Sequence, residues 1–213
     1  GSARRVAQYV YNGNYGSNKV KFGAYYGGSS KRNMKNLDLV NKRKNAWGTG
    51  LIFNHAIDSI QNVTVAAGFT REISENANNT SLFRNAYGLG LAYNFVHTTY
   101  GLDLERQVTK NQGDKRTKNE VRAVIRQGLN EDWNVYAMYA YKTDKHSNNT
   151  DRTRQFMVGT EYYVFNQGSL KVKPFIEWQA TRTKYENTFD KDSGKQLDRS
   201  RDFKTVIGLR AYW

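Results

Sequence analysis

The 213-residue sequence has no cysteine and only one proline, Pro174, and nowhere does it hold a long run of apolar residues. The lack of cysteine excludes a disulfide framework, a thiolate metal site and a thiol nucleophile. No segment approaches the roughly 18 consecutive apolar residues that a transmembrane helix needs. A mean hydropathy of −0.82 is also too polar for a helical membrane protein.

Glycine, aromatic residues and positive charge are abundant instead. The chain holds 18 Gly, 15 Tyr, 10 Phe and 4 Trp, and its net charge is +14. An aromatic content of 14% is far above that of disordered segments, and a chain rich in Gly and Tyr with almost no Pro favours a β protein. Gly1-Ser2 without a Met is typical of a cloning remnant, so we expect residues 3–213 to form a single domain.

Apolar residues alternate with polar ones along the whole chain. In 87–95, Tyr-Gly-Leu-Gly-Leu-Ala-Tyr-Asn-Phe, one face is aromatic and aliphatic and the other is small or polar. Segments 133–141 and 154–165 repeat this design, with aromatic residues near the ends of the apolar face. Such a face is typical of a lipid-facing band between two interfacial aromatic girdles. The pattern therefore favours a barrel whose apolar side points outward.

The same alternation predicts eleven strands, at 4–11, 19–28, 45–55, 62–73, 85–95, 98–108, 119–128, 133–143, 154–165, 169–182 and 202–213. Interval 29–44, where Leu37 and Leu39 flank Asp38, is expected to hold a twelfth. We thus predict an all-β fold, a transmembrane antiparallel up-and-down β-barrel of 12 strands, with 10 strands as the alternative. An even count puts both termini in the periplasm, and Pro174 predicts a bulge or local break.

Connectors are predicted to alternate in length. Short ones fall near 56–60, 95–97, 129–132 and 166–168, and long polar ones near 74–83, 108–118, 144–153 and 184–200. Outer-membrane barrels carry short turns at the periplasm and long loops outside.

If the apolar faces meet lipid, the opposite positions face the lumen. The basic side chains predicted there to guide anions are Arg122, Arg126, Lys142, Lys171, Lys173, Lys204 and Arg210. Carboxylates such as Glu105, Glu120 and Glu161 fall on the same side. The sequence leaves two roles open for the cations: they guide solutes, or they pair with these carboxylates and brace the barrel.

Two segments carry a resemblance to known proteins. Residues 203–213, which end on Trp213, resemble the C-terminal strand of bacterial outer-membrane proteins, whose terminal aromatic residue belongs to the signal for the barrel-assembly machinery. Arg5-Val-Ala-Gln-Tyr9 followed by Lys19-Val-Lys21-Phe22 is similar to the opening hairpin of the small monomeric porins of the KdgM and NanC type. This resemblance implies a bacterial outer-membrane channel, a monomer amid lipid and lipopolysaccharide, for passive diffusion of anionic sugars without a cofactor.

Other functions remain open beside the channel. The barrel of a polysaccharide exporter and a surface adhesin or receptor with a plugged lumen are the main alternatives, and an outer-membrane enzyme is a third. His55 and His97 are expected at periplasmic turns, and His146 lies near Asp144 in an outer loop. We expect no catalytic site, no cofactor and no metal, because no compact acid–base set or metal-ligand spacing is present. The basic residues are too scattered to predict nucleic-acid binding.

Overall fold

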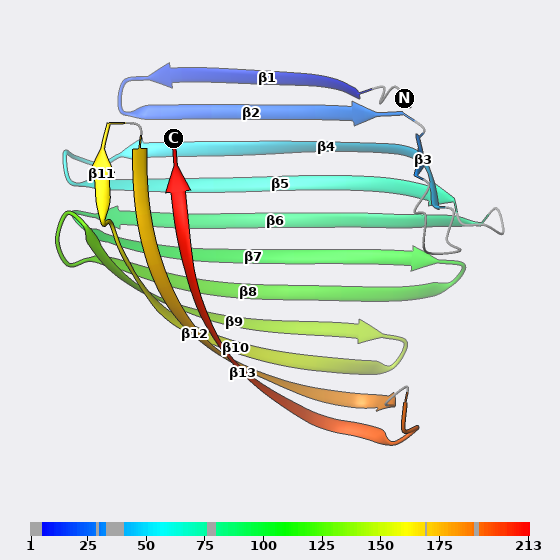
Figure 1. The fold of residues 1–213 in the computed structure, drawn as a ribbon. Coiled ribbons are helices and arrows are strands. Elements are labelled where there is room, and N and C mark those ends of the chain that lie inside the picture. The colour runs from blue at the N-terminus through cyan, green and yellow to red at the C-terminus, as the bar shows by residue number, and fades with distance from the viewer. Residues whose placement is uncertain (1–5, 29, 33–40, 76–79, 169, 190–191) are drawn as a thin grey trace.

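The computed structural model describes residues 6–28, 30–32, 41–75, 80–168, 170–189 and 192–213. These residues form thirteen strands of one antiparallel sheet (Figure 1). No helix in these ranges is long and apolar enough to cross a membrane. The strands are β1 (Val6–Tyr15), β2 (Asn18–Gly27), β3 (Ser30–Arg32), β4 (Asn41–Ala56), β5 (Gln61–Glu75), β6 (Ser81–Phe95), β7 (Thr98–Asn111), β8 (Asp114–Gly128), β9 (Trp133–His146), β10 (Asn149–Tyr162), β11 (Phe165–Gln167), β12 (Leu170–Phe189) and β13 (Gln196–Tyr212).

The strands follow one another in up-and-down order across the sheet. β3 pairs with β4 beyond the end of β2, and β11 pairs with β12 beyond the end of β10, so each short segment extends the strand before it. The predicted all-β, antiparallel up-and-down class, at a size of about twelve strands, is confirmed. The strand expected around Leu37 and Leu39 lies outside the described residues.

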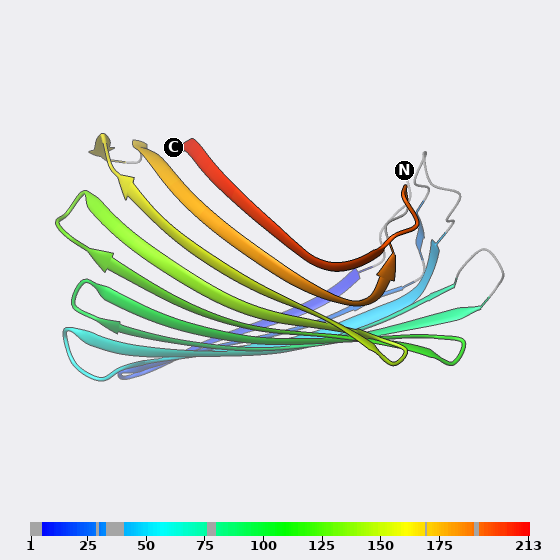
Figure 2. The same cartoon turned by 90° about the horizontal axis from the view of Figure 1, so that it is seen from below.

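Figure 2 shows a curved, open sheet whose two edges are β1 and β13. Both edge strands run from the end that carries the β2–β4 connection toward the end of the β1–β2 turn (Figure 1). Since β1 and β13 run in the same direction, an antiparallel barrel closes only with a strand of opposite direction between them.

The placement of the ends corrects a prediction. The prediction puts both termini at the end of the sheet that carries the short turns, such as the β1–β2 turn, which is called the short-turn end. Instead, Val6 and Tyr212 lie at opposite ends of the sheet, and only Tyr212 is at the short-turn end (Figure 1). The physical reason lies in the β2–β4 connection: β3 continues the direction of β2 along β4 and does not return across the sheet. The described parts of the interval near 29–44 belong to β3 and β4, and they contain no further strand that reverses direction.

Two of the predicted long connectors are wrong. The β7–β8 hairpin turns at Gln112 and Gly113, whose φ angles are +47° and +88°, and Asn111 pairs directly with Asp114. The β9–β10 hairpin turns at Ser147, φ +55°. Strands thus continue through 108–118 and 144–153 because ladder hydrogen bonds need no apolar face. Hydrophobic alternation reveals only the part of a strand that faces lipid.

Pro174 produces a break on one side of β12. Pairing of β12 with β10 stops at Glu161 opposite Phe175 and resumes in β11 at Phe165 opposite Val172. On the β13 side, Pro174 stays in register with Leu209. Proline has no N–H to donate, so the ladder is lost on one side only. The predicted local break is confirmed there.

The sheet has no apolar core of the usual kind. Among the described residues only Ala46 and Ala140 are buried hydrophobic residues, whereas Leu89 and Leu91 are 38% and 40% exposed. Leu89 lies between Ala67 and Leu104 in the cross-strand register, so the apolar face is continuous over β5, β6 and β7. The apolar side chains lie on the face that the alternation predicts to meet lipid.

Aromatic rings form a ladder along the edge of this apolar face. Trp47, Phe69 and Tyr87 lie side by side on β4, β5 and β6, with successive ring centroids 5.0 Å apart. Trp178 and Phe203 stack at 6.1 Å on β12 and β13. These contacts across strands have the arrangement of an interfacial girdle.

Candidate functional site on the inner face

The face opposite the apolar one, the inner face, carries a row of glycines over part of the sheet. Gly23, Gly50, Gly68 and Gly88 are directly opposite one another across β2, β4, β5 and β6. A Cβ on Gly88 would meet nothing within 4 Å, and one on Gly50 or Gly68 would meet only a backbone oxygen at 3.7 Å. This glycine row borders a hollow of about 460 Å³ that Lys21, Asp103 and Glu105 also line.

Other inner-face glycines are covered by rings. The ring of Tyr136 lies over Gly159 and that of Phe175 over Gly208, each directly across from its glycine. A side chain at either glycine would displace the ring. Placed in this way, the Tyr136 hydroxyl donates a hydrogen bond of 2.8 Å to Glu177 Oε1.

Glu161 is the centre of a charged cluster on β8, β10, β12 and β13. Its side chain is 1% exposed and forms ion pairs with Arg126, with Lys173 at 2.9 Å and with Arg210 at 3.5 Å. Arg210 is also 3.5 Å from Glu177. Buried charges need such partners because burial removes their hydration.

The same ion pairs require the sheet to be curved around β10. Arg126 on β8 and Arg210 on β13 reach Glu161 across the intervening strands β9 and β12. Two strand spacings amount to about 10 Å on a flat sheet. Side chains on both sides of β10 therefore converge on the concave face that Figure 2 shows.

Aromatic rings also hold these cations. Lys173 Nζ lies 5.1 Å from the ring centroid of Tyr163 and 5.6 Å from that of Tyr212. The Arg210 guanidinium lies 4.3 Å from the Phe175 ring centroid. Cation–π attraction is strongest where water is excluded, as at Lys173, which is only 5% exposed.

A second cluster surrounds Glu120 on β8. Arg122 Nη2 and Lys142 Nζ lie 2.5 Å and 3.4 Å from its two carboxylate oxygens. Glu105 is directly opposite Glu120, and Asp103 is directly opposite Arg122. The middle of the inner face therefore carries both signs of charge.

The seven predicted lumen cations all lie on the inner face by register. Five of them belong to the two clusters, while Lys171 and Lys204, opposite Tyr212 and Gln179, pair with no acidic side chain of the described ranges. Arg122 and Arg126 share a face, as predicted, but bind different carboxylates. Sequence reasoning missed Tyr136, because ring-over-glycine contacts depend on cross-strand register.

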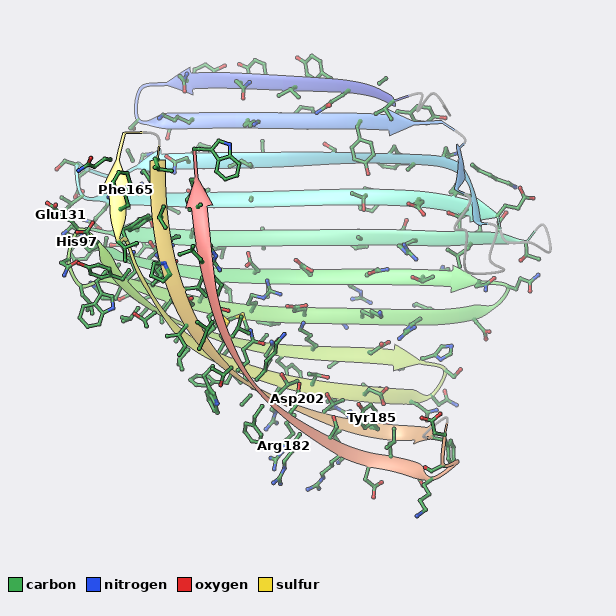
Figure 3. All side chains as sticks on the ribbon, in the orientation of Figure 1. His97, Glu131, Phe165, Arg182, Tyr185 and Asp202 are labelled. Carbon is green, nitrogen blue, oxygen red and sulfur yellow. The ribbon has the colours of Figure 1, made fainter. Side chains whose placement is uncertain are left out.

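The three histidines lie at different places: His146 ends β9, opposite Arg116, and the other two lie at the other end of the sheet. His97 lies with Glu131 at the short-turn end (Figure 3), and His55 Nδ1 is 2.6 Å from Asn18 Oδ1. At the opposite end, beyond Tyr141 and the apolar band, Asp144 accepts hydrogen bonds of 2.8 and 2.6 Å from Arg116. The guanidinium lowers the pKa of Asp144, which makes this carboxylate a poor base.

No group of three or more acidic or histidine side chains that could hold a metal occurs in the part of the chain that the structure describes.

No family model matches the sequence, and no curated protein matches it. Solved structures of OmpT, an outer membrane protein of Vibrio cholerae, are similar in fold. The loop L8 deletion mutant has a TM-score of 0.61 at 14% identity and covers 98% of this chain and 62% of its own. The outer-membrane expressed form has a TM-score of 0.60 at 15% identity, over 98% and 64%. The in-vitro folded form has a TM-score of 0.56 at 10% identity, over 100% and 90%.

These likenesses show the fold alone, and the chain spans less than two thirds of the first structure's length. The fold is that of the outer-membrane β-barrel proteins. The outward apolar face and the charged inner face fit this class.

Proposed function

We propose that this protein is an outer-membrane channel through which small anionic solutes, acidic oligosaccharides above all, diffuse passively. The main observation in support is the contrast between two parts of the inner face. The glycine row leaves space over β2 to β6, and the strands from β8 to β13 present cations. A polar lumen with open space is what a diffusion channel requires.

The charge balance favours anions on the cation-rich side. Five of the seven predicted lumen cations contact three carboxylates, those of Glu120, Glu161 and Glu177. Lys171 and Lys204 contribute charge that no described acid offsets. A sugar carboxylate exchanges contacts along such a wall, and exposed arginines offer it two parallel hydrogen bonds. Asp103 and Glu105 border the glycine row and direct anions toward the other wall.

The further parts of this proposal rest on the sequence resemblance and on general features of outer-membrane barrels. The protein works as a monomer of the KdgM and NanC type, surrounded by outer-membrane lipid and lipopolysaccharide. The short-turn end, where β13 ends, is the periplasmic end. The strand ending at Trp213 is recognised by the barrel-assembly machinery. The function involves no catalysis, no cofactor and no nucleic acid.

A second candidate is a plugged barrel with an export or receptor role. The buried Glu161 favours it, because three cations around one carboxylate can brace a wall without guiding any solute. Conductance separates the two candidates.

Planar-bilayer recordings under a KCl gradient are the direct test of the channel. We expect discrete conductance steps and a reversal potential that shows anion preference, strongest at low salt because ions screen the wall. The double variant Lys171→Gln/Lys204→Gln should reduce that preference and still fold. Lys195→Gln in the exposed β12–β13 turn is the matched control and should change nothing. Cation preference, or an absence of steps, would contradict the proposal.

A further inference from the structure

Six basic residues form a two-row array on β10, β12 and β13. Arg154, Arg182 and Arg201 are directly opposite one another across the three strands. The next row, two residues farther from the apolar band, is again basic throughout. Its members are Arg152, Lys184 and Arg199. All six side chains are exposed.

The array lies on the lipid-facing side of the sheet. Two residues along each strand from the first basic row, and on the same face, are Phe156, Ala180 and Phe203. These residues belong to the apolar band, whose ring of Trp178 stacks on Phe203. Figure 3 shows Arg182 and Tyr185 on the β12–β13 hairpin, toward its turn. The basic array therefore begins where the apolar band ends, on the side of the long β2–β4 connection.

Six cations this close together repel one another, so the array is electrostatically unfavourable unless an anion binds to it. Directly opposite side chains have Cβ atoms about 4.5–5.5 Å apart, and like charges at that spacing repel. None of the six forms an ion pair with an acidic residue of the described ranges. Glu186, nearby on β12, accepts a hydrogen bond of 2.8 Å from the Thr150 amide. Asp202 is opposite Thr181 and so belongs to the inner face.

We propose that this basic array binds the phosphorylated head group of a glycolipid of the outer leaflet, of the lipid A type. Arginine binds phosphate through two parallel hydrogen bonds, and two rows of three cations offer room for more than one phosphate. The lipid, not free phosphate, is the ligand because acyl chains then lie along Phe156 and Phe203. This site is independent of channel activity.

The test is native mass spectrometry of the full chain in detergent with diphosphoryl lipid A. The variant Arg154→Gln/Arg182→Gln/Arg201→Gln should bind lipid A about tenfold more weakly or worse, since each charge-assisted bond is strong. Arg106→Gln is the matched control: Arg106 also faces lipid, but its neighbours are Tyr87 and Asn119, so affinity should not change. Dephosphorylated lipid A should bind the parent as weakly as the triple variant binds lipid A.

Several outcomes would overturn the site. They are full affinity in the triple variant, an equal loss in Arg106→Gln, equal binding of dephosphorylated lipid, or displacement of lipid A by equimolar inorganic phosphate. If the triple glutamine variant does not fold, Arg182→Gln alone serves, because Arg182 lies between two cations. Its expected affinity is several-fold lower, and unchanged affinity would refute the proposal.

Discussion

Replacing Glu161 with Gln is expected to destabilise the barrel by about 3 kcal/mol, because it leaves a buried cation unpaired. The cation that loses most is Lys173, because its side chain is 6% exposed and water cannot replace the carboxylate. Arg126 and Arg210 are each 43% exposed, so water can hydrate them. This value is therefore at the low end of the usual cost of breaking a buried ion pair. Urea unfolding in lipid vesicles, followed by tryptophan fluorescence, measures it.

Two further variants isolate the cause. Glu131→Gln removes an exposed carboxylate at the short-turn end (Figure 3) and should change stability by less than about 0.5 kcal/mol. Adding Lys173→Met to Glu161→Gln removes the unpaired cation and should recover part of the loss. If the double variant is no more stable than Glu161→Gln, the account of Glu161 as the partner of a buried lysine is wrong.

Adjacent substitutions on β6 should differ sharply in cost. Leu89→Arg puts a charge on the lipid-facing side between Tyr87 and Tyr93, and should cost about 2–4 kcal/mol if the site is near the bilayer midplane. Gly88→Arg points into the lumen, where a Cβ meets nothing within 4 Å and Glu105 is directly opposite. Its cost should stay within about 1 kcal/mol.

The same vesicle unfolding assay compares the two. Gly88→Arg should also lower single-channel conductance, because it fills space beside the glycine row. Equal costs for the two arginines, or a greater cost at Gly88, would mean that lipid and lumen have been assigned to the wrong faces.

Much of the fold was predictable because a bilayer imposes a strict pattern. Alternation over 87–95 identified β6, and since its period is two, it also assigned Leu89 to lipid and Gly88 to the lumen. The polar hairpins at Gln112 and Ser147 were not predictable by this route, since both of their faces carry polar residues and no alternation results. The opposite placement of Val6 and Tyr212 depends on whether the connection between β2 and β4 adds a strand of reversed direction. Hydrophobic alternation does not predict the direction of a strand.

The site was predictable only in part. Inward cations such as Lys173 follow from register, but their partners depend on how strongly the sheet curves around Glu161. The basic array had a signal in the sequence, namely Arg-Thr-Arg at 152–154, Arg-Thr-Lys at 182–184 and Arg-Ser-Arg at 199–201. Only the cross-strand register shows that these three basic pairs are neighbours.

Cysteine accessibility along β6 tests the central claim, that one face of this sheet meets lipid and the other lines an aqueous lumen. The chain has no cysteine, so single variants at Gly88, Leu89, Gly90, Leu91 and Ala92 carry one thiol each. In nanodiscs, a charged maleimide should label positions 88, 90 and 92 rapidly and leave 89 and 91 nearly unlabelled, while a lipophilic maleimide should show the reverse. Uniform labelling by the charged reagent, or the opposite alternation, would contradict the account.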